Sequence, residues 1–433
     1  FRNLSRLANV VLLGNKIRVL RSGSFKDLPL LHNVVLSRNR IDTIEAGAFN
    51  NLSKLSSLLL QHNNLTSFNL DCLYGSRNSA LLLNLSQNSL VSLHAGGDVP
   101  DSSFNETHGY GVHTLDLRHN QLAEIDDNFL ATVGSTLLNL FISNNKISRL
   151  TGIFDALSVL QTFYADHNAI SNVTFGTFQW SPELQVIVLS DNKIESIGEL
   201  AFVNLTKLRV VDLSHNRIAS IPEDAFENTA LERLNLSFNN MTHFNCIAAV
   251  KDTLRVLDLS GNRISSIGAH HFDGFHTMLA LNFSQNQLIA VDENSFAGLA
   301  QLMHLDLAHN PLFTLNRACL LPLKTLGTLK LRNCSLARLP PFHLKRLSNL
   351  DVAENFLFNL STETFRHLRS LRALDVSRNL LETMPRHLWR FLPLLHSLDV
   401  SGNPISSLAT DSFADAHGLQ SLDIRRLQLK FLD

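Results

Sequence analysis

Aspartate recurs along the chain, each time between two aliphatic residues of a short, mostly apolar segment. Its positions are Asp116, Asp212, Asp258, Asp306, Asp351, Asp375, Asp399 and Asp423. Carboxylates that lie close together can transfer protons or bind a divalent cation. One repeated L-D-L-S setting is instead typical of outward residues on an open sheet, which offers no pocket to shift a pKa. We therefore predict that these carboxylates have no catalytic role.

The other polar residues show no catalytic or cofactor-binding pattern. His270 and His271 are adjacent but have no cysteine pair at metal-ligand spacing. The sequence has no phosphate-binding glycine loop, no G-x-S-x-G elbow and no H-E-x-x-H motif. A formal net charge of −1 provides no basic field for nucleic acid. We expect no enzyme, no cofactor, no metal site and no nucleic-acid partner.

Four cysteines are present, at Cys72, Cys246, Cys319 and Cys334. Cys72 and Cys246 lie about seven repeats apart, too far for a disulfide at the ~4.8 Å spacing of strands. We expect both to be buried thiols. Cys319 and Cys334 fall in adjacent repeats, so the spacing leaves a disulfide between them open.

An eleven-residue pattern of leucines recurs through the chain. It reads LRVVDLSHNRI at 208–218, LRVLDLSGNRI at 254–264 and LMHLDLAHNPL at 302–312, which fits L-x-x-L-x-L-x-x-N-x-L. The indexing residue of each copy is Asn15, Asn39, Asn63, Asn88, Asn120, Asn145, Asn168, Asn192, Asn216, Asn239, Asn262, Asn286, Asn310, Cys334, Asn355, Asn379 or Asn403. A degenerate copy has Leu427 at this position. Most steps are 23 to 25 residues long.

This repeat predicts a right-handed leucine-rich-repeat horseshoe with a parallel β-sheet on its concave side. The residues three and five before each Asn, such as Leu213 and Val211, should point inward from a short strand. The Asn side chain should satisfy backbone groups inside the turn. We expect an α/β-type solenoid whose convex side is irregular or forms short helices.

An apolar anchor ten residues after the Asn marks the convex side. It is Phe25, Phe49, Phe178, Phe202, Phe226, Phe272, Phe296, Phe365 or Phe413, and once Trp389. Two steps depart from the regular length. The step from Asn88 is long, which predicts an inserted, exposed loop at 94–111. The step from Cys334 is short and contains Pro340 and Pro341, which predicts an extended segment.

We predict that residues 1–433 form a single array of about 18 repeats of ~24 residues. Both ends should be uncapped, since no cysteine-rich module covers the first or the last repeat. The sequence is therefore expected to be a fragment of a longer protein.

The convex segments AFNNLSKL (48–55), AFVNLTKL (201–208) and SFAGLAQL (295–302) carry a family resemblance. The chain resembles extracellular leucine-rich-repeat proteins such as Toll-type receptors and Slit-type guidance proteins, and is most similar to the chaoptin-like adhesion glycoproteins. The resemblance implies a cell-surface adhesion module. It also implies attachment to the plasma membrane only through an anchor outside this fragment. A Toll-type receptor ectodomain is the alternative function.

Sequons of the form N-x-S/T support an extracellular, glycosylated chain. We expect glycans at Asn51, Asn64, Asn84, Asn105, Asn172, Asn204, Asn235, Asn240, Asn282, Asn333 and Asn359. Some sequons arise from the repeat itself. Asn105 lies in the expected loop, and we predict that it is occupied if any site is.

The outward residue four before each Asn is Asp or Asn in most of the later repeats. It is instead Val11, Val35 and Leu59 in the first three copies, and Phe141, Tyr164 and Val188 in copies six to eight. Exposed aromatic residues often anchor protein interfaces, although they also suit β-strands. We predict that Phe141, Tyr164 and Val188 form a partner-binding row on the concave face, with Asp166 and His167 as a polar rim. The residues leave open whether the protein partner is a second copy of the chain or another molecule.

Overall fold

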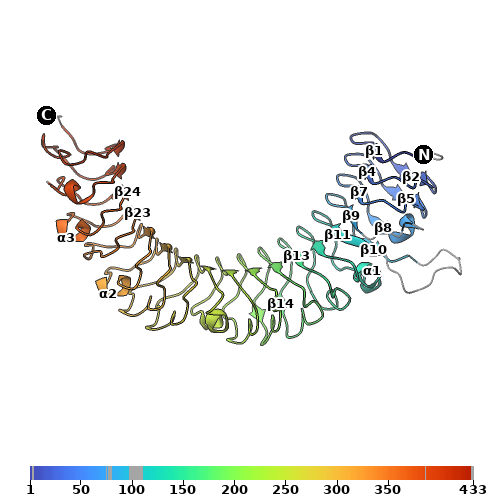
Figure 1. Cartoon of the computed structure of the whole chain (residues 1–433), viewed down its shortest axis with the longest axis horizontal. Helices are drawn as coiled ribbons and strands as arrows, with labels where there is room; N and C mark the ends of the chain where they lie inside the picture. The colour runs from blue at the N-terminus through green and yellow to red at the C-terminus, as the bar shows by residue number, and fades with distance from the viewer. Residues whose placement is uncertain (2–3, 75, 77–79, 97–110, 386, 431–433) are drawn as a thin grey trace. The chain divides into compact units, whose positions relative to one another are not determined.

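A computed structural model describes Phe1, Ser76 and residues 4–74, 80–96, 111–385 and 387–430. Figure 1 shows the whole chain. The chain divides into two compact units, Phe1–Leu231 and Glu232–Asp433. We refer to these as the first and the second unit and describe each by itself.

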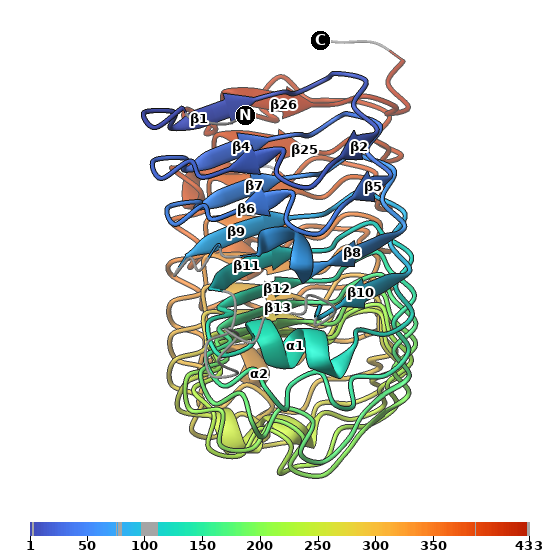
Figure 2. The same cartoon turned by 90° about the vertical axis from the view of Figure 1, so that its right-hand side faces the viewer.

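The first unit carries a parallel sheet in which consecutive repeats supply neighbouring strands. In order, the strands are β1 (Asn9–Val11), β4 (Asn33–Val35), β7 (Ser57–Leu59), β9 (Leu81–Asn84), β11 (Val112–Asp116), β12 (Asn139–Phe141), β13 (Thr162–Tyr164), β15 (Val186–Val188) and β17 (Val210–Asp212). Figure 2 shows the strands from β1 to β13 stacked in this order.

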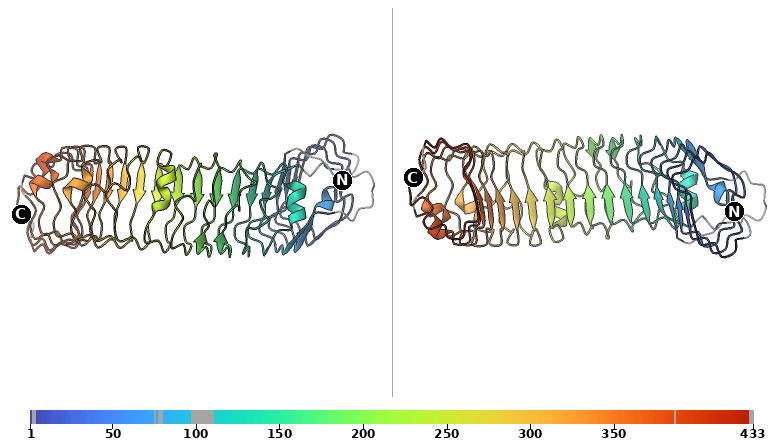
Figure 3. Two further views of the ribbon diagram at one scale, coloured as in Figure 1. Left: turned by 90° about the horizontal axis from the view of Figure 1, so that it is seen from below. Right: turned by 90° about the horizontal axis from the view of Figure 1, so that it is seen from above.

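The second unit repeats the arrangement. Its sheet is formed by β18 (Arg233–Asn235), β19 (Val256–Asp258), β20 (Ala280–Asn282), β21 (His304–Asp306), β22 (Thr328–Lys330), β23 (Asn349–Asp351), β24 (Ala373–Asp375), β25 (Ser397–Asp399) and β26 (Ser421–Asp423). Figure 3 shows the strands of each unit as successive arrows that point the same way. The parallel-sheet solenoid predicted from the repeat is therefore confirmed.

Alternation along each strand decides which side chains form the core. Leu140 and Ile142 are buried on either side of Phe141, and Val211 and Leu213 are buried on either side of Asp212. Successive strand residues point to opposite faces, so the residue between them is outward. We call the side on which these outward residues lie the sheet face and the opposite side the outer face.

The repeat asparagines hold neighbouring repeats together through a fixed set of hydrogen bonds. The Nδ2 atom of Asn216 donates to the carbonyls of Leu213 at 3.0 Å and of Leu189, in the preceding repeat, at 2.9 Å. Its Oδ1 atom accepts from the backbone N–H of Ile194 at 3.0 Å. Asn39, Asn63, Asn262, Asn286 and Asn379 bond in the same way. This confirms the predicted role of the Asn in satisfying backbone groups of the turn.

Cys334 replaces the asparagine and supplies only part of this pattern. Its Sγ atom donates to the Leu307 carbonyl at 3.2 Å, as an amide would. The thiol offers no equivalent of Oδ1, and the N–H of Leu312 donates to the Asn310 carbonyl at 2.8 Å instead. The next residue, Phe313, adopts a positive φ of 40°. The backbone thus turns locally where the amide acceptor is missing.

The outer face consists of turns, short helices and short strand pairs. The helices are η1 (Leu70–Leu73) and α1 (Asp127–Val133) in the first unit, and η2 (Asn245–Val250), α2 (Arg317–Leu320), α3 (Thr362–Phe365) and η3 (Trp389–Phe391) in the second. The strand pairs, all in the first unit, are β2 (Val19–Leu20) with β5 (Thr43–Ile44), β3 (Phe25–Lys26) with β6 (Phe49–Asn50), β8 (Ser67–Asn69) with β10 (Ser92–His94), and β14 (Asn172–Val173) with β16 (Ser196–Ile197). These elements match the irregular convex side that the sequence predicts.

Phenylalanine rings form the predicted ladder under the outer face. The rings of Phe178, Phe202 and Phe226 stack at centroid distances of 5.4 and 5.0 Å, and all three are buried. The ladder is therefore core, as expected. The inserted loop predicted at 94–111 lies largely outside the described residues, which include 94–96 and 111.

Candidate functional site

Phe141, Tyr164 and Val188 lie side by side on the sheet face of the first unit. Phe141 is the register partner of Tyr164, and Tyr164 is the register partner of Val188. Each is partly exposed, whereas the residues before and after it are buried: Leu140, Ile142, Phe163, Ala165, Ile187 and Leu189. The three outward orientations inferred from alternation are thus found, while partner binding at this row remains a prediction.

The two rings of the row are fixed by contacts on both sides. The centroids of Phe141 and Tyr164 lie 5.4 Å apart with planes tilted by 57°, a favourable geometry for aromatic pairs. The guanidinium of Arg118 lies 5.3 Å from the Phe141 centroid. Arg118 is itself held by two hydrogen bonds to Asp116, at 2.9 and 2.7 Å, and this hydrogen bonding raises the pKa of Arg118. The cation is therefore held over the ring.

Two further residues extend the apolar surface beyond the predicted row. Val186 on β15 and Val210 on β17 are register partners and are partly exposed. They lie on the same face as Val188, because alternate residues of a strand share a face. We call Phe141, Tyr164, Val186, Val188 and Val210 the aromatic patch. Reading the strands at a second outward position, six residues before the Asn, would have identified both valines.

Charged residues border the aromatic patch at the carboxyl ends of its strands. Asp166 accepts a short hydrogen bond from the Ser143 hydroxyl. The Nδ1 atom of His167 lies 3.2 Å from an Asp166 oxygen and 3.8 Å from an Asp191 oxygen. Asp166 and His167 thus lie where the sequence placed a polar rim, and Asp191 adds a second carboxylate.

The first three repeats present a separate apolar row on the sheet face. Val35 and Leu59 are partly exposed and Val11 is 66 % exposed. Leu13, two residues after Val11, is exposed as well. This row contains no aromatic residue.

The recurring aspartates are used to close turns. Asp212, Asp258 and Asp399 each accept from the backbone N–H two residues on, at 2.9, 2.9 and 2.8 Å. The Oγ atom of Ser214 also donates to Asp212, at 2.6 Å. This local bonding explains the L-D-L-S setting without a catalytic role.

The sheet face of the second unit is charged rather than apolar. Arg332 binds Asp351, Glu354 and Asp375 at 3.0, 3.2 and 2.6 Å. Lys330 pairs with Asp306 at 3.0 Å. A shallow hollow of about 350 Å³ lies between Lys330, Asp351 and Asp375. Among these outward residues the cations are matched by carboxylates, in contrast to the aromatic patch of the first unit.

Comparison with known proteins establishes the family. The leucine rich repeat family matches residues 5–65, 29–90, 111–170, 159–218, 206–248, 252–312 and 345–405. These segments cover most of the sequence. The chain belongs to the leucine-rich-repeat family.

Individual relatives of this leucine-rich-repeat protein match a smaller part of its sequence than the family does. Tsukushi-A from Xenopus laevis is 36 % identical over 90 residues, which span 20 % of this chain and 25 % of Tsukushi-A. The chain thus spans about a quarter of the length of the curated relatives it matches.

Solved structures share the fold over a larger part of the chain. YopM from Yersinia enterocolitica matches with a TM-score of 0.69 at 25 % identity over 99 % of this chain and 80 % of YopM. The plant peptide hormone receptor RGFR1, solved in complex with RGF2, matches with a TM-score of 0.69 at 24 % identity. The match covers 98 % of this chain and 67 % of the receptor chain. A chain of the Drosophila Toll–Spatzle complex matches with a TM-score of 0.65 at 22 % identity. The match covers 81 % of this chain and 53 % of the other. The fold is that of a protein-interaction scaffold.

All four cysteines of this leucine-rich-repeat protein are free and buried. Burial raises the pKa of Cys72, and raises that of Cys246, Cys319 and Cys334 to about 12. The thiol of Cys319 donates to the Asn316 carbonyl at 2.9 Å, while that of Cys334 donates to the Leu307 carbonyl at 3.2 Å. The disulfide that spacing left open between Cys319 and Cys334 is not formed.

The predicted glycosylation asparagines differ in exposure. Asn51, Asn64, Asn172, Asn204, Asn333 and Asn359 are exposed, whereas Asn84, Asn235, Asn240 and Asn282 are partly buried. Asn105 lies outside the described residues. Exposure makes the first group accessible, and glycosylation itself remains a prediction.

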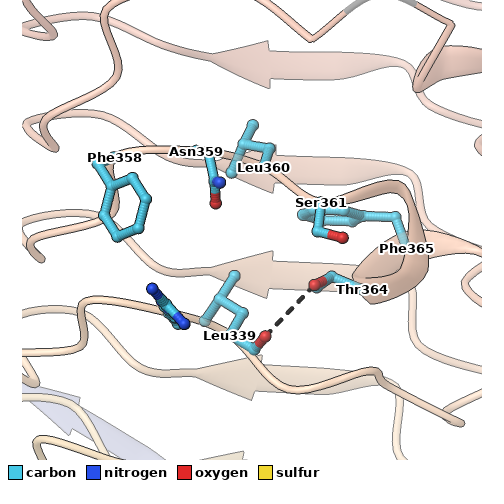
Figure 4. Close-up of a pocket in the computed structure, with 8 residues that line it drawn as sticks. Leu339, Phe358, Asn359, Leu360, Ser361, Thr364 and Phe365 are labelled. Atoms are coloured by element: carbon cyan, nitrogen blue, oxygen red, sulfur yellow. Dashed lines mark hydrogen bonds between the residues drawn. The ribbon is translucent and has the colours of Figure 1, made fainter.

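Asn359 borders a hollow of about 340 Å³ in the second unit, lined also by Arg338, Phe358 and Ser361 (Figure 4). The Thr364 hydroxyl donates to the Leu339 carbonyl at 3.4 Å across its floor. The hollow lies against the short, proline-containing repeat that begins at Cys334, in which residues 338–344 form neither helix nor strand. It contains no group of catalytic residues.

Neither a metal-ion cluster nor a membrane-crossing helix occurs in the described residues. No group of three or more His, Cys, Asp or Glu side chains is arranged to hold a metal ion there. Within the same residues, no helix has the length and apolar character needed to cross a membrane.

Proposed function

We propose that this leucine-rich-repeat chain is a cell-surface protein-binding and adhesion module whose protein partner docks on the aromatic patch. The single observation that carries the proposal is the patch itself. Phe141, Tyr164 and Val188 stand in register, outward and partly exposed, at positions that are carboxylate or amide in most later repeats.

The composition of the patch suits a protein interface. Tyrosine and arginine dominate the binding energy of such interfaces, and apolar anchors are usually surrounded by a polar rim. Tyr164 lies at the centre, Arg118 borders Phe141, and Asp166 with His167 borders Tyr164. The rings are already packed against each other, so binding costs little side-chain entropy.

Known structures of similar fold support a protein or peptide partner. RGFR1 was solved with RGF2, and Toll with Spatzle. We extend this to the present chain only as part of the proposal. A location outside the cell is supported by the six exposed sequon asparagines, and the chaoptin-like resemblance favours adhesion and a membrane anchor.

The test is a cell-aggregation assay. Suspension cells would display the full 433-residue chain through an added anchor, either as wild type or as Phe141→Ser/Tyr164→Ser/Val188→Ser. Aggregation by the wild type and its loss in the triple variant, at equal surface amount, are expected.

A matched control is available on the outer face of the same unit. Phe175 and Trp180 are 66 % and 57 % exposed. Phe175→Ser/Trp180→Ser removes comparable apolar surface and should leave aggregation unchanged. If the control abolishes aggregation and the triple variant does not, the patch is not the docking site. A wild-type chain that never aggregates cells contradicts adhesion through a second copy of the chain, and favours a different partner, as in the alternative of a Toll-type receptor ectodomain.

A further inference from the structure

Three basic side chains occupy one structural position on consecutive repeats of the second unit. Lys324, Lys345 and Arg369 each lie five residues before the central strand residue, which is Leu329, Leu350 or Leu374. These leucines are register partners in β22, β23 and β24. The three cations therefore form a column on the outer-face side, and all three are exposed.

A pair of histidines lies next to this column and confirms its register. His343 and His367 lie seven residues before the strand centres Leu350 and Leu374, and their ring centroids are 4.5 Å apart with planes tilted by 36°. The guanidinium of Arg317, in α2, lies 3.2 Å from Nε2 of His343. Figure 1 shows α2 and α3 on the side of the second unit away from β23 and β24.

Few carboxylates oppose these charges. Glu363 is the only acidic residue in the segments 317–326, 340–347 and 362–371, and it lies 3.8 Å from Arg366. Within the described residues, Lys324, Lys345 and Arg369 have no carboxylate partner. The cations of the sheet face, in contrast, are paired: Lys330 with Asp306, and Arg332 with three carboxylates.

The electrostatic effect of this crowding is visible at His367. Partial burial lowers the pKa of His367, and the charges of His343, Arg366 and Lys345 lower it further, while Glu363 acts in the opposite direction. A bound polyanion would offset the mutual repulsion of these groups.

We propose that Lys324, Lys345 and Arg369, with His343 and His367 beside them, bind a linear sulfated polysaccharide. We call these five residues the basic column. A chain of regularly charged sugars suits cations that recur once per strand, at ~4.8 Å along the stack. Clusters of Lys and Arg are known sites for heparin as well as for nucleic acids. The phenylalanine rings of the column's segments, Phe342 and Phe365, are buried and cannot stack on bases, so we favour the polysaccharide.

The test compares the affinity of the full chain for heparin with that of two charge variants. Lys324→Gln/Lys345→Gln/Arg369→Gln should weaken binding roughly tenfold or more at ~0.1 M salt and reduce the slope of log Kd against log salt by about two to three. Arg233→Gln/Lys251→Gln/Arg263→Gln removes three exposed charges elsewhere in the unit and should change affinity less than twofold. Circular dichroism checks that both variants fold.

Acidification provides a second measurement. Binding should tighten between pH 7.5 and 5.5, because a bound polyanion favours the protonated form of a nearby histidine. His343→Asn/His367→Asn should lose this dependence. The proposal is overturned if the wild type does not bind heparin or if both triple variants bind alike. It is also overturned if single-stranded RNA or phosphatidylserine vesicles bind the column more tightly than heparin at equal charge.

Discussion

The ring of Phe141 on β12 lies 5.4 Å from the ring of its register partner Tyr164 on β13, at an angle of 57°. Buried neighbours fix both strands, so this pair of rings is presented to solvent in one arrangement. A preformed pair of this kind loses little freedom when a partner covers it.

Tyr164→Ala should weaken partner binding by about 2 kcal/mol while leaving the thermal midpoint nearly unchanged, because the ring is outward and not core. Its neighbour Phe163 is fully buried, so Phe163→Ala should cost about 3–5 kcal/mol of stability. Titration of the partner and thermal unfolding of both variants check this. Equal loss of stability in the two variants would contradict the assignment of Tyr164 to the surface.

Asn216→Ala should lower the free energy of unfolding by about 2–4 kcal/mol, because the Ile194 N–H and the Leu189 and Leu213 carbonyls lose their partner. Asn216→Cys should cost less than Asn216→Ala, since Cys334 shows that a thiol can donate to the preceding repeat. Urea unfolding of the two variants measures the difference. If Asn216→Cys proves as destabilising as Asn216→Ala, a thiol donor has no value at this position.

The four cysteine thiols should not react with a thiol reagent in the folded chain at pH 8, and should react fully in denaturant. Burial raises the pKa of Cys246, Cys319 and Cys334 to about 12, above the ~8.5 of an unfolded thiol. The unfolded chain therefore loses these protons first as the pH rises.

The same shifts fix the sign of the pH dependence. The stability contributed by these thiols is complete below pH ~8.5 and falls as the pH rises from there toward about 12. Thermal midpoints at pH 8 and pH 10 for the wild type and a Cys246→Ala/Cys319→Ala variant measure it. A wild type that loses no more stability than the variant would contradict the raised pKa values.

Arg332→Gln should destabilise the second unit by about 1–3 kcal/mol, because Asp351 and Asp375 then lose their cation and Glu354 keeps only Arg378. Arg332→Lys should recover part of this, since an ammonium keeps the charge but not the branched geometry. Arg255 lies 4.0 Å from Glu232 and is more exposed, so Arg255→Gln should cost less than about 0.5 kcal/mol. Denaturant unfolding at low and high salt distinguishes the three.

Glycan occupancy should be higher at Asn64, Asn172 and Asn359 than at Asn84, Asn235 and Asn282. The first three are exposed, whereas the Oδ1 atom of Asn84 accepts from Ser86 and the Nδ2 atom of Asn282 donates to Asp258 at 3.1 Å. A glycan would replace one of the two hydrogens on Nδ2 of Asn282 and crowd that bond. Glycopeptide mapping of secreted chain checks the order, and full occupancy at Asn282 with none at Asn172 would reverse it.

The sequence alone determined the repeat, the strands and the side of each strand residue. The reason is that a strand alternates with a period of two and each repeat carries an asparagine at a fixed offset. Counting back from Asn168 therefore places Tyr164 outward and Phe163 inward without a structure. The hydrogen-bonding role of the repeat asparagines could be predicted in the same way, because each turn leaves the same backbone groups to satisfy.

Contacts between different repeats needed the tertiary structure. The contacts of Arg118 with Phe141, of Arg332 with three carboxylates, and between the rings of His343 and His367 join residues 19 to 43 positions apart. The outer segments vary in length, and the short repeat after Cys334 shifts which residues become neighbours. Whether Cys319 and Cys334 form a disulfide was undecided for the same reason, because spacing only places them in adjacent repeats. The structure shows the Cys319 thiol bonded to the Asn316 carbonyl and the Cys334 thiol bonded to the Leu307 carbonyl.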